Sequence, residues 1–312
     1  MFKPLMSRYV SIRLIQGIIA LFVASIVVFC LARLTGNPLS MLLPETATQQ
    51  EYDALAKQLG FDKPLPVQYL IFVSKAIRGD FGKSIRYRKP VTDSIVERAP
   101  ATIKLALAAA VVSFVIALPL GVVAAVKRDK WQDFLAKAFA ILGQSIPTFW
   151  LGIMLIQLFA VLSGWFPAGG YGGFRYWILP AITIGYNSTA GVLRLTRSAM
   201  LDVLGSDYVR LARIKGLPNR RVIWKHALRN ALIPVVTFSG IIYVHLLMGS
   251  VVTETIFAWP GIGRLAYESV LYRDFPMIQA LIILFVGLYI VFNLMIDLSY
   301  SYLDPRVRFV KE

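Results

Sequence analysis

The stretch LALAAAVVSFVIALPLGVVAAV, residues 105–126, decides the fold class of this chain. It runs for 22 residues without a charged side chain. A helix rises about 1.5 Å per residue, so a helix of this length crosses a hydrocarbon core of about 30 Å. Because no water is present there to satisfy the peptide groups, the backbone must bond to itself as a helix. The stretch therefore predicts a transmembrane helix.

Five further uncharged runs are long enough to approach or cross a bilayer. Only 16% of the residues are charged, against about 25% in soluble domains, and the mean hydropathy is +0.64. We therefore expect an all-α integral membrane protein with six transmembrane helices. The run at 176–193 is weakened by Pro180 and Gly185, so a re-entrant or interfacial segment is its alternative. The five runs are Leu14–Ala32, Ala138–Phe174, Tyr176–Leu193, Asn230–Thr253 and Phe275–Ile296.

The formal charge of +16 is distributed unevenly along the chain. Nineteen lysines and arginines lie in four segments on one side of the expected helices, and three lie in the short loops of the other side. Because basic loops stay in the cytoplasm, both termini are expected there, in a multi-pass protein. The net positive charge is thus explained by the orientation of the chain in a lipid bilayer, and it does not indicate a nucleic-acid-binding protein. The basic segments are 1–13, 127–137, 194–231 and 301–312, and the short loops are 163–176 and 258–277.

The chain is expected to have three parts. Residues 1–32 form the cytoplasmic N-terminus and the first transmembrane helix. Residues 33–100 form a small extracytoplasmic module, with helical patterns at Thr48–Leu59 and Val67–Ile77 and a C-cap at Gly60. Residues 101–312 form the core domain, with transmembrane helices two to six, a basic loop at 198–231 between helices four and five, and a cytoplasmic tail.

No residue set in the sequence predicts an enzyme. Gly82–Lys83–Ser84 ends like a phosphate-binding loop, but Ile77 stands where that loop needs its first glycine. Gly261–Ala266 resembles a dinucleotide loop, but no βαβ unit surrounds it and no acidic residue follows at the expected distance. His226 and His245 are isolated. We therefore expect no ATP site, no catalytic residues, no metal and no cofactor in this chain.

The basic loop contains the stretch DYVRLARIKG, residues 207–216, between two long apolar runs. Gly216 is expected to end a short helix there, and Leu217–Pro218 to turn the chain. A rigid helical loop can transmit force to the membrane helices, which a flexible loop cannot do. The apolar residues expected to share one face of the helix are Leu201, Leu204, Tyr208, Leu211 and Ala212.

This stretch resembles the cytoplasmic coupling loop of permeases of ATP-binding-cassette (ABC) importers, in their peptide/nickel branch. The family pattern is Glu-Ala-Ala, three residues and Gly, followed by Leu-Pro or Ile-Pro. Ala212, Gly216 and Ile233–Pro234 fit it, whereas Arg210 and Leu211 replace the Glu and the first Ala. Further signatures of the family are Gly36–Asn37–Pro38, Leu59–Pro64 with Gly79–Gly82, Thr253–Phe257 with Pro260–Arg264, and Asp304–Pro305–Arg306.

The resemblance implies a permease subunit in the cytoplasmic or inner membrane of a bacterium or archaeon. Its partners would be a second homologous permease subunit, two cytoplasmic ATPase subunits and an extracytoplasmic solute-binding protein. Small peptides are the expected cargo, and a nickel chelate, glutathione or an opine is the alternative. The residues implied to contact the ATPase are Asp207, Tyr208, Arg210, Leu211, Ala212, Arg213, Lys215, Gly216, Leu217 and Pro218.

A stand-alone secondary transporter is the alternative of another class. It predicts inverted repeats and a carboxylate at the bilayer midplane. We find no internal repeat, and Glu254 and Asp297 lie near the ends of their apolar runs.

Two other groups of residues are candidates for function. Lys104 and Glu254 either approach one another near the outer gate or face water independently. Trp259, Arg264 and Arg273 join them as candidates for the outer gate or for contact with the binding protein. Small and polar residues of the apolar runs are candidates to line the pathway, among them Asn187, Ser188 and Ser239.

Overall fold

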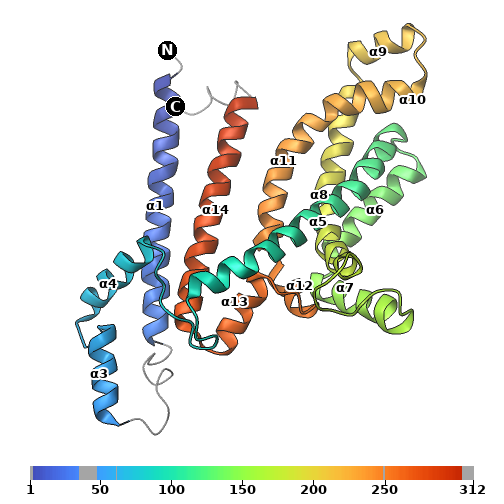
Figure 1. The fold of residues 1–312 in the computed structure, drawn as a ribbon. Helices are drawn as coiled ribbons and strands as arrows, with labels where there is room; N and C mark the ends of the chain where they lie inside the picture. Colours follow the sequence, from blue (N-terminus) through green and yellow to red (C-terminus); the bar gives the residue numbers. More distant parts are fainter. Residues whose placement is uncertain (1–2, 35–47, 61, 249, 304–312) are drawn as a thin grey trace. The chain divides into compact units, whose positions relative to one another are not determined.

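The computed structural model describes residues 3–34, 48–60, 62–248 and 250–303. The regular elements of these residues are helices joined by turns and loops, with one isolated bridge between Lys83 and Pro90 (Figure 1). The chain divides into two compact units. Unit 1 comprises Met1–Pro100 and Arg264–Leu294, and unit 2 comprises Ala101–Gly263 and Met295–Glu312. The signatures Gly36–Asn37–Pro38 and Asp304–Pro305–Arg306 lie outside the described residues.

Unit 1 contains the two short helices expected in the extracytoplasmic module. They are α3 (Gln49–Leu59) and α4 (Leu65–Ile77). Thr48 caps α3 by accepting from the backbone N–H of Glu51, whose side chain accepts in return from the backbone of Thr48. Gly60 ends the helix with φ +75°, a left-handed conformation that favours glycine. Both predicted helices are present in the structure. Such helices can be predicted because the residues that begin and end them are neighbours in the sequence.

The long helices of unit 1 pack through aromatic and small residues. In α1 (Lys3–Leu34), the Ser25 hydroxyl lies 2.8 Å from that of Tyr69 on α4, and the ring of Phe29 packs edge-on against Tyr69 with 5.4 Å between centroids. Gly17 of α1 lies so close to α14 (Phe275–Leu303) that an added Cβ would stand 2.6 Å from a methyl carbon of Ile290. Glycine therefore permits the contact between α1 and α14.

Two helix boundaries differ from those expected. α5 (Val91–Val126) begins ten residues before the expected start at Ala101, inside the segment assigned to the module. The third apolar run is not one helix. It breaks into α6 (Trp131–Ser145), α7 (Thr148–Leu155) and the π-helix η1 (Ile156–Leu162), with a bend of 102°.

Proline causes the break between α6 and α7. Pro147 has no N–H to donate to the preceding turn, and its ring disfavours helical angles at Ile146. Ile146 accordingly has extended angles, with φ −81° and ψ 122°. By contrast, α8 (Arg175–Leu204) continues through Pro180 as one helix of 30 residues. The uncertain run at 176–193 is thus part of a continuous helix.

Helix α8 lies against α5 and α6 at backbone distance. A Cβ added to Gly185 of α8 would stand 2.6 Å from the carbonyl oxygen of Ala109 on α5, and one added to Gly121 of α5 would stand 2.7 Å from Cβ of Thr196. Nine of the sixteen buried residues that form this core among the described residues are alanine. Small residues allow such close packing where water supplies no hydrophobic driving force.

The helices that follow α8 belong to unit 2 as far as α12, whereas most of α13 belongs to unit 1. The pair α8 and α11 is joined by the segment that carries α9 and α10 at its tip (Figure 1). These elements are α9 (Asp207–Ile214), α10 (Asn219–Arg221), the π-helix η2 (Val222–Ala227), α11 (Leu228–Met248), α12 (Ser250–Ile256) and α13 (Ile262–Leu271).

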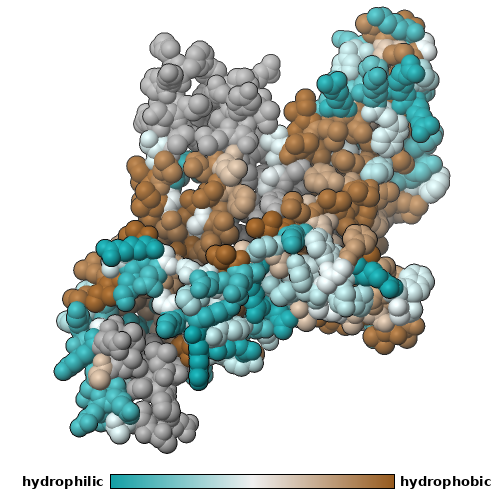
Figure 2. Space-filling view, in the orientation of Figure 1, coloured by the Kyte–Doolittle hydropathy of each residue, from teal (hydrophilic) through white to brown (hydrophobic). Residues whose placement is uncertain are grey.

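Three helices of the described residues are long and apolar enough to cross a membrane, within Ser11–Leu34, Val91–Val126 and Phe275–Met295. The bent pair of α6 with α7 and η1 makes a fourth if it counts as one span. Large apolar side chains remain exposed on these helices, and the surface is brown over them in Figure 2. The structure is therefore an all-helical membrane protein, and the expected number of six spans stays a prediction.

The contact of Gly185 with Ala109 is open to test. Replacing Gly185 by alanine should lower the apparent unfolding temperature of the purified protein in detergent, because overpacking costs about 1–3 kcal/mol. Gly173→Ala is the matched control, since nothing lies within 4 Å of its added Cβ. Equal unfolding temperatures for the two variants would contradict the close packing of α8 on α5.

Candidate functional site

The coupling loop at 198–231 is a helical hairpin whose turn is fixed by Gly216. Gly216 has φ +77°, and its N–H donates to the carbonyl of Arg213 at 2.9 Å. The N–H of Leu217 donates to the carbonyl of Ala212 at 3.3 Å. These two bonds form a Schellman motif, which satisfies the last carbonyls of α9 and needs a left-handed residue. Gly216 thus sets the direction in which the chain leaves α9.

The hairpin is attached to the membrane helices through a buried apolar cluster. Val209 of α9 and Val222 and Ala227 of η2 are fully buried. They pack with Met200 of α8 and Ala231 of α11 in the same cluster. Since this cluster joins α9 to both flanking helices, the hairpin and the adjoining ends of α8 and α11 form one packed body.

A second face of α9 is apolar and exposed. Tyr208, Leu211 and Ile214 are 41%, 52% and 80% exposed and follow one another at the spacing of a helix face. The expectation of one apolar stripe from Leu201 to Ala212 is therefore wrong. The helix breaks at Gly205, so α9 turns Val209 inward and leaves Tyr208 and Leu211 outside.

Polar contacts add little to the position of α9. The amide of Asn230 on α11 donates to the hydroxyl of Tyr208 at 2.7 Å. Arg210 lies 3.8 Å from Asp207, but both side chains are exposed and such pairs contribute about 0–1 kcal/mol. Of the ten residues implied to contact the ATPase, Ala212 and Leu217 are half-buried and the other eight are exposed.

A buried ion pair fixes α8 to α6 near the hairpin. Arg197 of α8 donates from Nε and Nη2 to the two carboxylate oxygens of Asp133 on α6, each at 2.7 Å. Asp133 is 1% exposed and also accepts from Lys137 at 3.0 Å and from the backbone N–H of Asp129 at 3.1 Å. Sequence reasoning missed this pair. Its signal was Asp133 itself, the one acidic residue between the Lys127–Lys130 loop and the long uncharged run that follows.

Glu254 lies in a buried polar network of unit 2. Its carboxylate is fully buried and accepts from the hydroxyls of Thr102 on α5 and Ser250 on α12, at 2.8 and 2.9 Å. Thr102 in turn accepts from the N–H of Ile262 at 2.8 Å. A Cβ added to Gly261 would stand 2.3 Å from the carboxylate, so only glycine lets the backbone approach it. Glu254 therefore ties α5, α12 and the 257–263 loop together.

The ion pair expected as one alternative for Lys104 and Glu254 is not formed. Lys104 is exposed on α5, whereas the carboxylate of Glu254 is bonded to hydroxyls inside unit 2. Trp259 is also buried, with its indole donating to the carbonyl of Ala101 at 3.0 Å and its ring edge-on to Tyr171. The buried side chain of Trp259 anchors the 257–263 loop and is not available for contact with a partner protein.

The basic candidates Arg264 and Arg273 lie in unit 1. Arg264 lies 2.9 Å from Glu268, which also accepts from the hydroxyl of Tyr87 at 2.6 Å. Burial alone would raise the pKa of Glu268, but the Tyr87 hydrogen bond and the charges of Arg264 and Arg98 outweigh burial and hold the pKa below its usual value. Arg273 is exposed, with φ +52°.

Asp274 anchors the loop after Gly82 to this part of unit 1. It is buried and accepts from the hydroxyl of Ser84 and from the backbone N–H of Arg86. The guanidinium of Arg86 lies 3.4 Å from the ring centroid of Tyr272. The Gly82–Lys83–Ser84 segment is therefore bound to the carboxylate of Asp274. A phosphate-binding loop would instead direct its donors to an anionic ligand, so the structure does not support a phosphate site here.

The candidates for pathway lining lie on two helices. Asn187 is exposed on α8, and its amide donates to the carbonyl of Gly143 on α6 at 3.4 Å, while Ser188 is half-buried. Ser239 is part of α11, but its side chain lies outside the described residues. In the described ranges no group of three or more His, Cys, Asp or Glu side chains is placed to hold a metal ion.

The hydrogen-bond network around Glu254 predicts that loss of the Thr102 hydroxyl lowers the stability of the protein. Thr102→Val should destabilise the protein by about 1–3 kcal/mol, because it leaves the buried N–H of Ile262 without its acceptor. Thr183→Val is the control, since the hydroxyl of Thr183 bonds only back to Leu179 of its own helix at 2.8 Å. Thermal unfolding in detergent compares the two. A loss no greater for Thr102→Val than for Thr183→Val would contradict the network.

The buried ion pair predicts charge rescue. Asp133→Arg and Arg197→Asp should each destabilise the protein by about 3–5 kcal/mol, because each leaves a buried charge without its partner. The double variant should recover part of this loss in the same unfolding assay. Glu97→Lys, at the more exposed pair with Lys89, should change stability by less than about 1 kcal/mol. A double variant that is no more stable than either single variant would argue against the pair.

Comparison with known proteins places these features in a family. Residues 117–309 match the family described as the binding-protein-dependent transport system inner membrane component, and residues 6–106 match its N-terminal part. The glutathione transport system permease protein GsiC of Escherichia coli strain K12 is 41% identical over 305 residues, which cover 97% of this chain and 100% of that protein. GsiC of Shigella dysenteriae serotype 1 (strain Sd197) gives the same values.

Solved structures agree at the level of the fold. The inward-facing MetNI methionine ABC transporter matches with a TM-score of 0.52 at 19% identity, over 70% of this chain and 96% of that chain. An amino acid ABC transporter solved with histidines matches with a TM-score of 0.50 at 16% identity, over 68% of this chain and 94% of that chain. The resemblance inferred from the motifs is confirmed: the chain belongs to the binding-protein-dependent transport system inner membrane components and is a permease subunit of an ABC importer.

Proposed function

We propose that this permease imports small peptides, with glutathione as the first cargo to test. Glutathione is a tripeptide, and a permease named for it shares 41% of its residues with this chain. A second, homologous permease subunit would complete the pathway, and an extracytoplasmic binding protein would deliver the cargo. Two cytoplasmic ATPase subunits would supply the energy, so this chain itself would not be an enzyme.

The proposed topology has six spans and both termini in the cytoplasm of a bacterial inner membrane. α8 and α11 would add two spans to the three found by length and composition and to the bent pair of α6 and α7. Residues 33–100 would then lie outside and the 198–231 coupling loop inside. The support for this arrangement is the excess of lysine and arginine in the segments assigned to the cytoplasm.

The coupling loop is proposed to receive the force of the ATPase. The observation that carries this proposal is the exposed apolar face of α9, on a hairpin packed rigidly onto α8 and α11. A monomer leaves such a face uncovered chiefly where a partner binds. When the ATPase subunits close on ATP, they would move α9 and with it the inner ends of α8 and α11. The helices would change orientation as packed bodies, which gives alternating access.

The outer residues are proposed to act on the other side of the membrane. Glu254 and Trp259 would set the shape of the outer gate from inside, because both are buried and bonded to α5. The more exposed cations Lys104, Arg264 and Arg273 would contact the binding protein. Asn187, Ser188 and Ser239 would line the pathway as small or uncharged polar groups.

The coupling role predicts a specific effect at Gly216. Gly216→Val should lower ATP-driven glutathione uptake several-fold in vesicles holding the complete transporter, because a β-branched residue at φ +77° costs about 1–3 kcal/mol and redirects the hairpin. Nothing lies within 4 Å of an added Cβ, so the effect would come from the backbone alone. Membrane insertion should be unchanged.

The matched control is Gly205→Val, because Gly205 has the right-handed φ of −82°. Uptake by Gly216→Val equal to that of this control would contradict the coupling role. Wild-type vesicles that fail to accumulate glutathione would contradict the cargo assignment alone. The coupling role would then still be measured by cargo-stimulated ATP hydrolysis with the peptide that the binding protein carries.

A further inference from the structure

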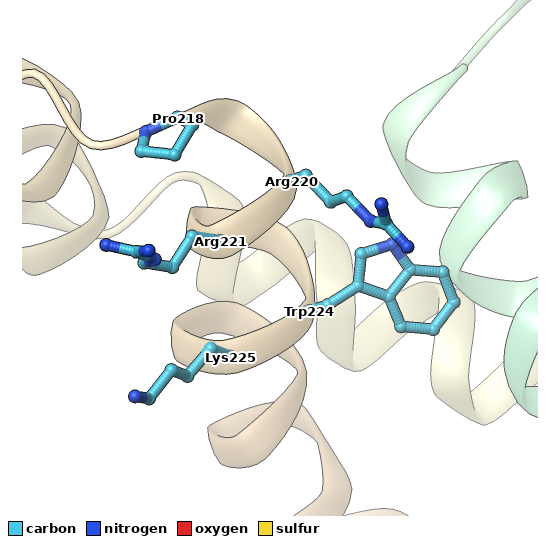
Figure 3. A pocket seen from close by; sticks show the side chains of 5 residues that line it. All are labelled: Pro218, Arg220, Arg221, Trp224 and Lys225. Atoms are coloured by element: carbon cyan, nitrogen blue, oxygen red, sulfur yellow. The ribbon is translucent and has the colours of Figure 1, made fainter.

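The hollow beside the turn of the coupling loop does not enclose a ligand. Its lining residues are Pro218, Arg220, Arg221, Trp224 and Lys225. Figure 3 shows Arg220 and Trp224 on one side of the helix and Arg221 and Lys225 on the other. Because these side chains diverge, they do not surround one group. A surface with a more definite chemistry lies in unit 1, on helix α4.

Helix α4 has two apolar stripes next to each other. The first stripe packs on α1, where the ring centroids of Tyr69 and Phe72 lie 5.4 and 5.8 Å from that of Phe29. The second stripe lies one residue further along the chain, about 100° round the helix axis. Its members recur at the spacing of one helix face and are Pro66, Leu70, Val73 and Ile77.

The second stripe is uncovered in the described structure. Leu70 is 66% exposed and Ile77 is 81% exposed. Every residue of α4 is described, and none of its side chains is fully buried. Figure 2 shows brown, apolar surface over α4 beside teal, hydrophilic surface. A row of large apolar side chains as exposed as this marks a surface that another molecule covers.

The contacts of α4 with α1 fix its level in the membrane. The hydroxyl of Tyr69 lies 2.8 Å from that of Ser25, inside the apolar span Ser11–Leu34. Ser25 stands nine residues before Leu34, which is about 13 Å along a helix, whereas half of the hydrocarbon core is about 15 Å thick. Tyr69 therefore reaches a part of α1 that lies within the bilayer, and α4 cannot stand clear of the membrane in water.

The surface of α1 next to α4 is itself apolar and exposed. Phe22 of α1 is 55% exposed and lies edge-on to Tyr69, with 6.3 Å between ring centroids. Ile18, one turn earlier on α1, is 65% exposed. Because α1 is long and apolar enough to cross the membrane, these side chains face lipid. The uncovered stripe of α4 thus belongs to a helix that adjoins a lipid-facing surface.

The length and the charges of α4 fit a helix that lies in one leaflet. Its 13 residues make about 20 Å, which is too short to cross a core of about 30 Å. Lys75 is exposed on the side of α4 away from the second stripe, and Lys63 and Arg78 flank the helix. No acidic residue stands between Lys63 and Gly79. Such cations reach phosphate headgroups while apolar side chains enter the acyl region.

The composition of the second stripe favours lipid over a second protein. Helices that pack on one another in membranes use small residues, as Gly17 does where α1 meets α14. The second stripe consists of one proline and three large aliphatic residues, and its side chains contain no hydrogen-bonding group. Acyl chains are fluid and cover such a stripe without a complementary shape.

We infer that α4 is embedded in the bilayer beside α1, with the second stripe against acyl chains and its flanking cations at the headgroups. In the proposed topology this is the outer leaflet. The inference depends on α1 as a membrane span and goes beyond the proposed transport function. Helix α4 then anchors the extracytoplasmic module to the membrane and is not part of its aqueous region.

The test locates nitroxide labels on α4 in the complete transporter, reconstituted in lipid vesicles with companion subunits that carry no cysteine. Cys30, the one cysteine of this chain, is replaced by serine, and one label at a time is attached at Leu70→Cys or Ile77→Cys. Electron paramagnetic resonance measures collisions of the label with oxygen, which dissolves in hydrocarbon, and with a polar nickel chelate, which stays in water. The ratio of oxygen to nickel accessibility should be high at both positions.

Two control positions calibrate this ratio. Lys75→Cys is the matched control on the opposite side of α4, and its ratio should be several-fold lower than that at 70 and 77. Ile18→Cys gives the value of a lipid-facing residue of α1, which the labels at 70 and 77 should approach. The four side chains replaced are exposed, so folding should be unaffected.

Two results would overturn the inference. Nickel accessibility at 70 and 77 as high as at 75 would mean that the second stripe faces water. Low accessibility to both reagents would mean that a protein surface, of the second permease subunit or of the binding protein, covers the stripe. The measurement needs neither cargo nor ATP, so a transporter that fails to accumulate glutathione would contradict the proposed function and leave this inference in place.

Discussion

The close approach of α8 to its neighbours is the constraint on which unit 2 depends. Gly185 and Gly121 bring α8 and α5 to backbone distance, where no larger residue fits. In a membrane, lipid solvates apolar side chains as well as protein does, so such contacts and buried polar pairs replace the hydrophobic effect. Asp133 and Arg197 add a bidentate ion pair near the hairpin. A helix held by such contacts would move as one body in the proposed coupling mechanism.

The same close packing supports the mechanical role that we propose for the coupling loop. The coupling loop contains no set of groups for bond chemistry. It combines a packed inner face at Val209 with an exposed outer face at Tyr208 and Leu211. The inner face gives rigidity and the outer face gives a contact surface. Gly216 joins them, because its left-handed turn fixes the path from α9 to α10. In the proposed coupling role, a force received on the exposed face of α9 would pass to α8 and α11 through this packing, with no need for a flexible joint.

Much of this architecture was predictable, because several of its signals are local. A few neighbouring residues determine each of these signals, namely the apolar runs, the caps of α3 and the glycine turn at 216. Other features depend on partners that are distant in sequence. Asp133 meets Arg197 across two helices, and no spacing rule connects residues 64 positions apart. The break at Pro147 lies inside the run Ala138–Phe174 that is predicted as one helix, because sequence alone does not say whether neighbours restore the lost hydrogen bond. The inward direction of Val209 follows from the break at Gly205, which a continuous helical pattern conceals.

The central claim is that this permease moves its cargo only when a separate ATPase subunit drives it. The most direct measurement is cargo accumulation in sealed vesicles that hold both permease subunits, the binding protein and ATP, with and without the ATPase subunits. Accumulation against a gradient is expected only when the ATPase is present. Accumulation against a gradient in vesicles that lack it, driven by a proton or sodium gradient, would contradict the account.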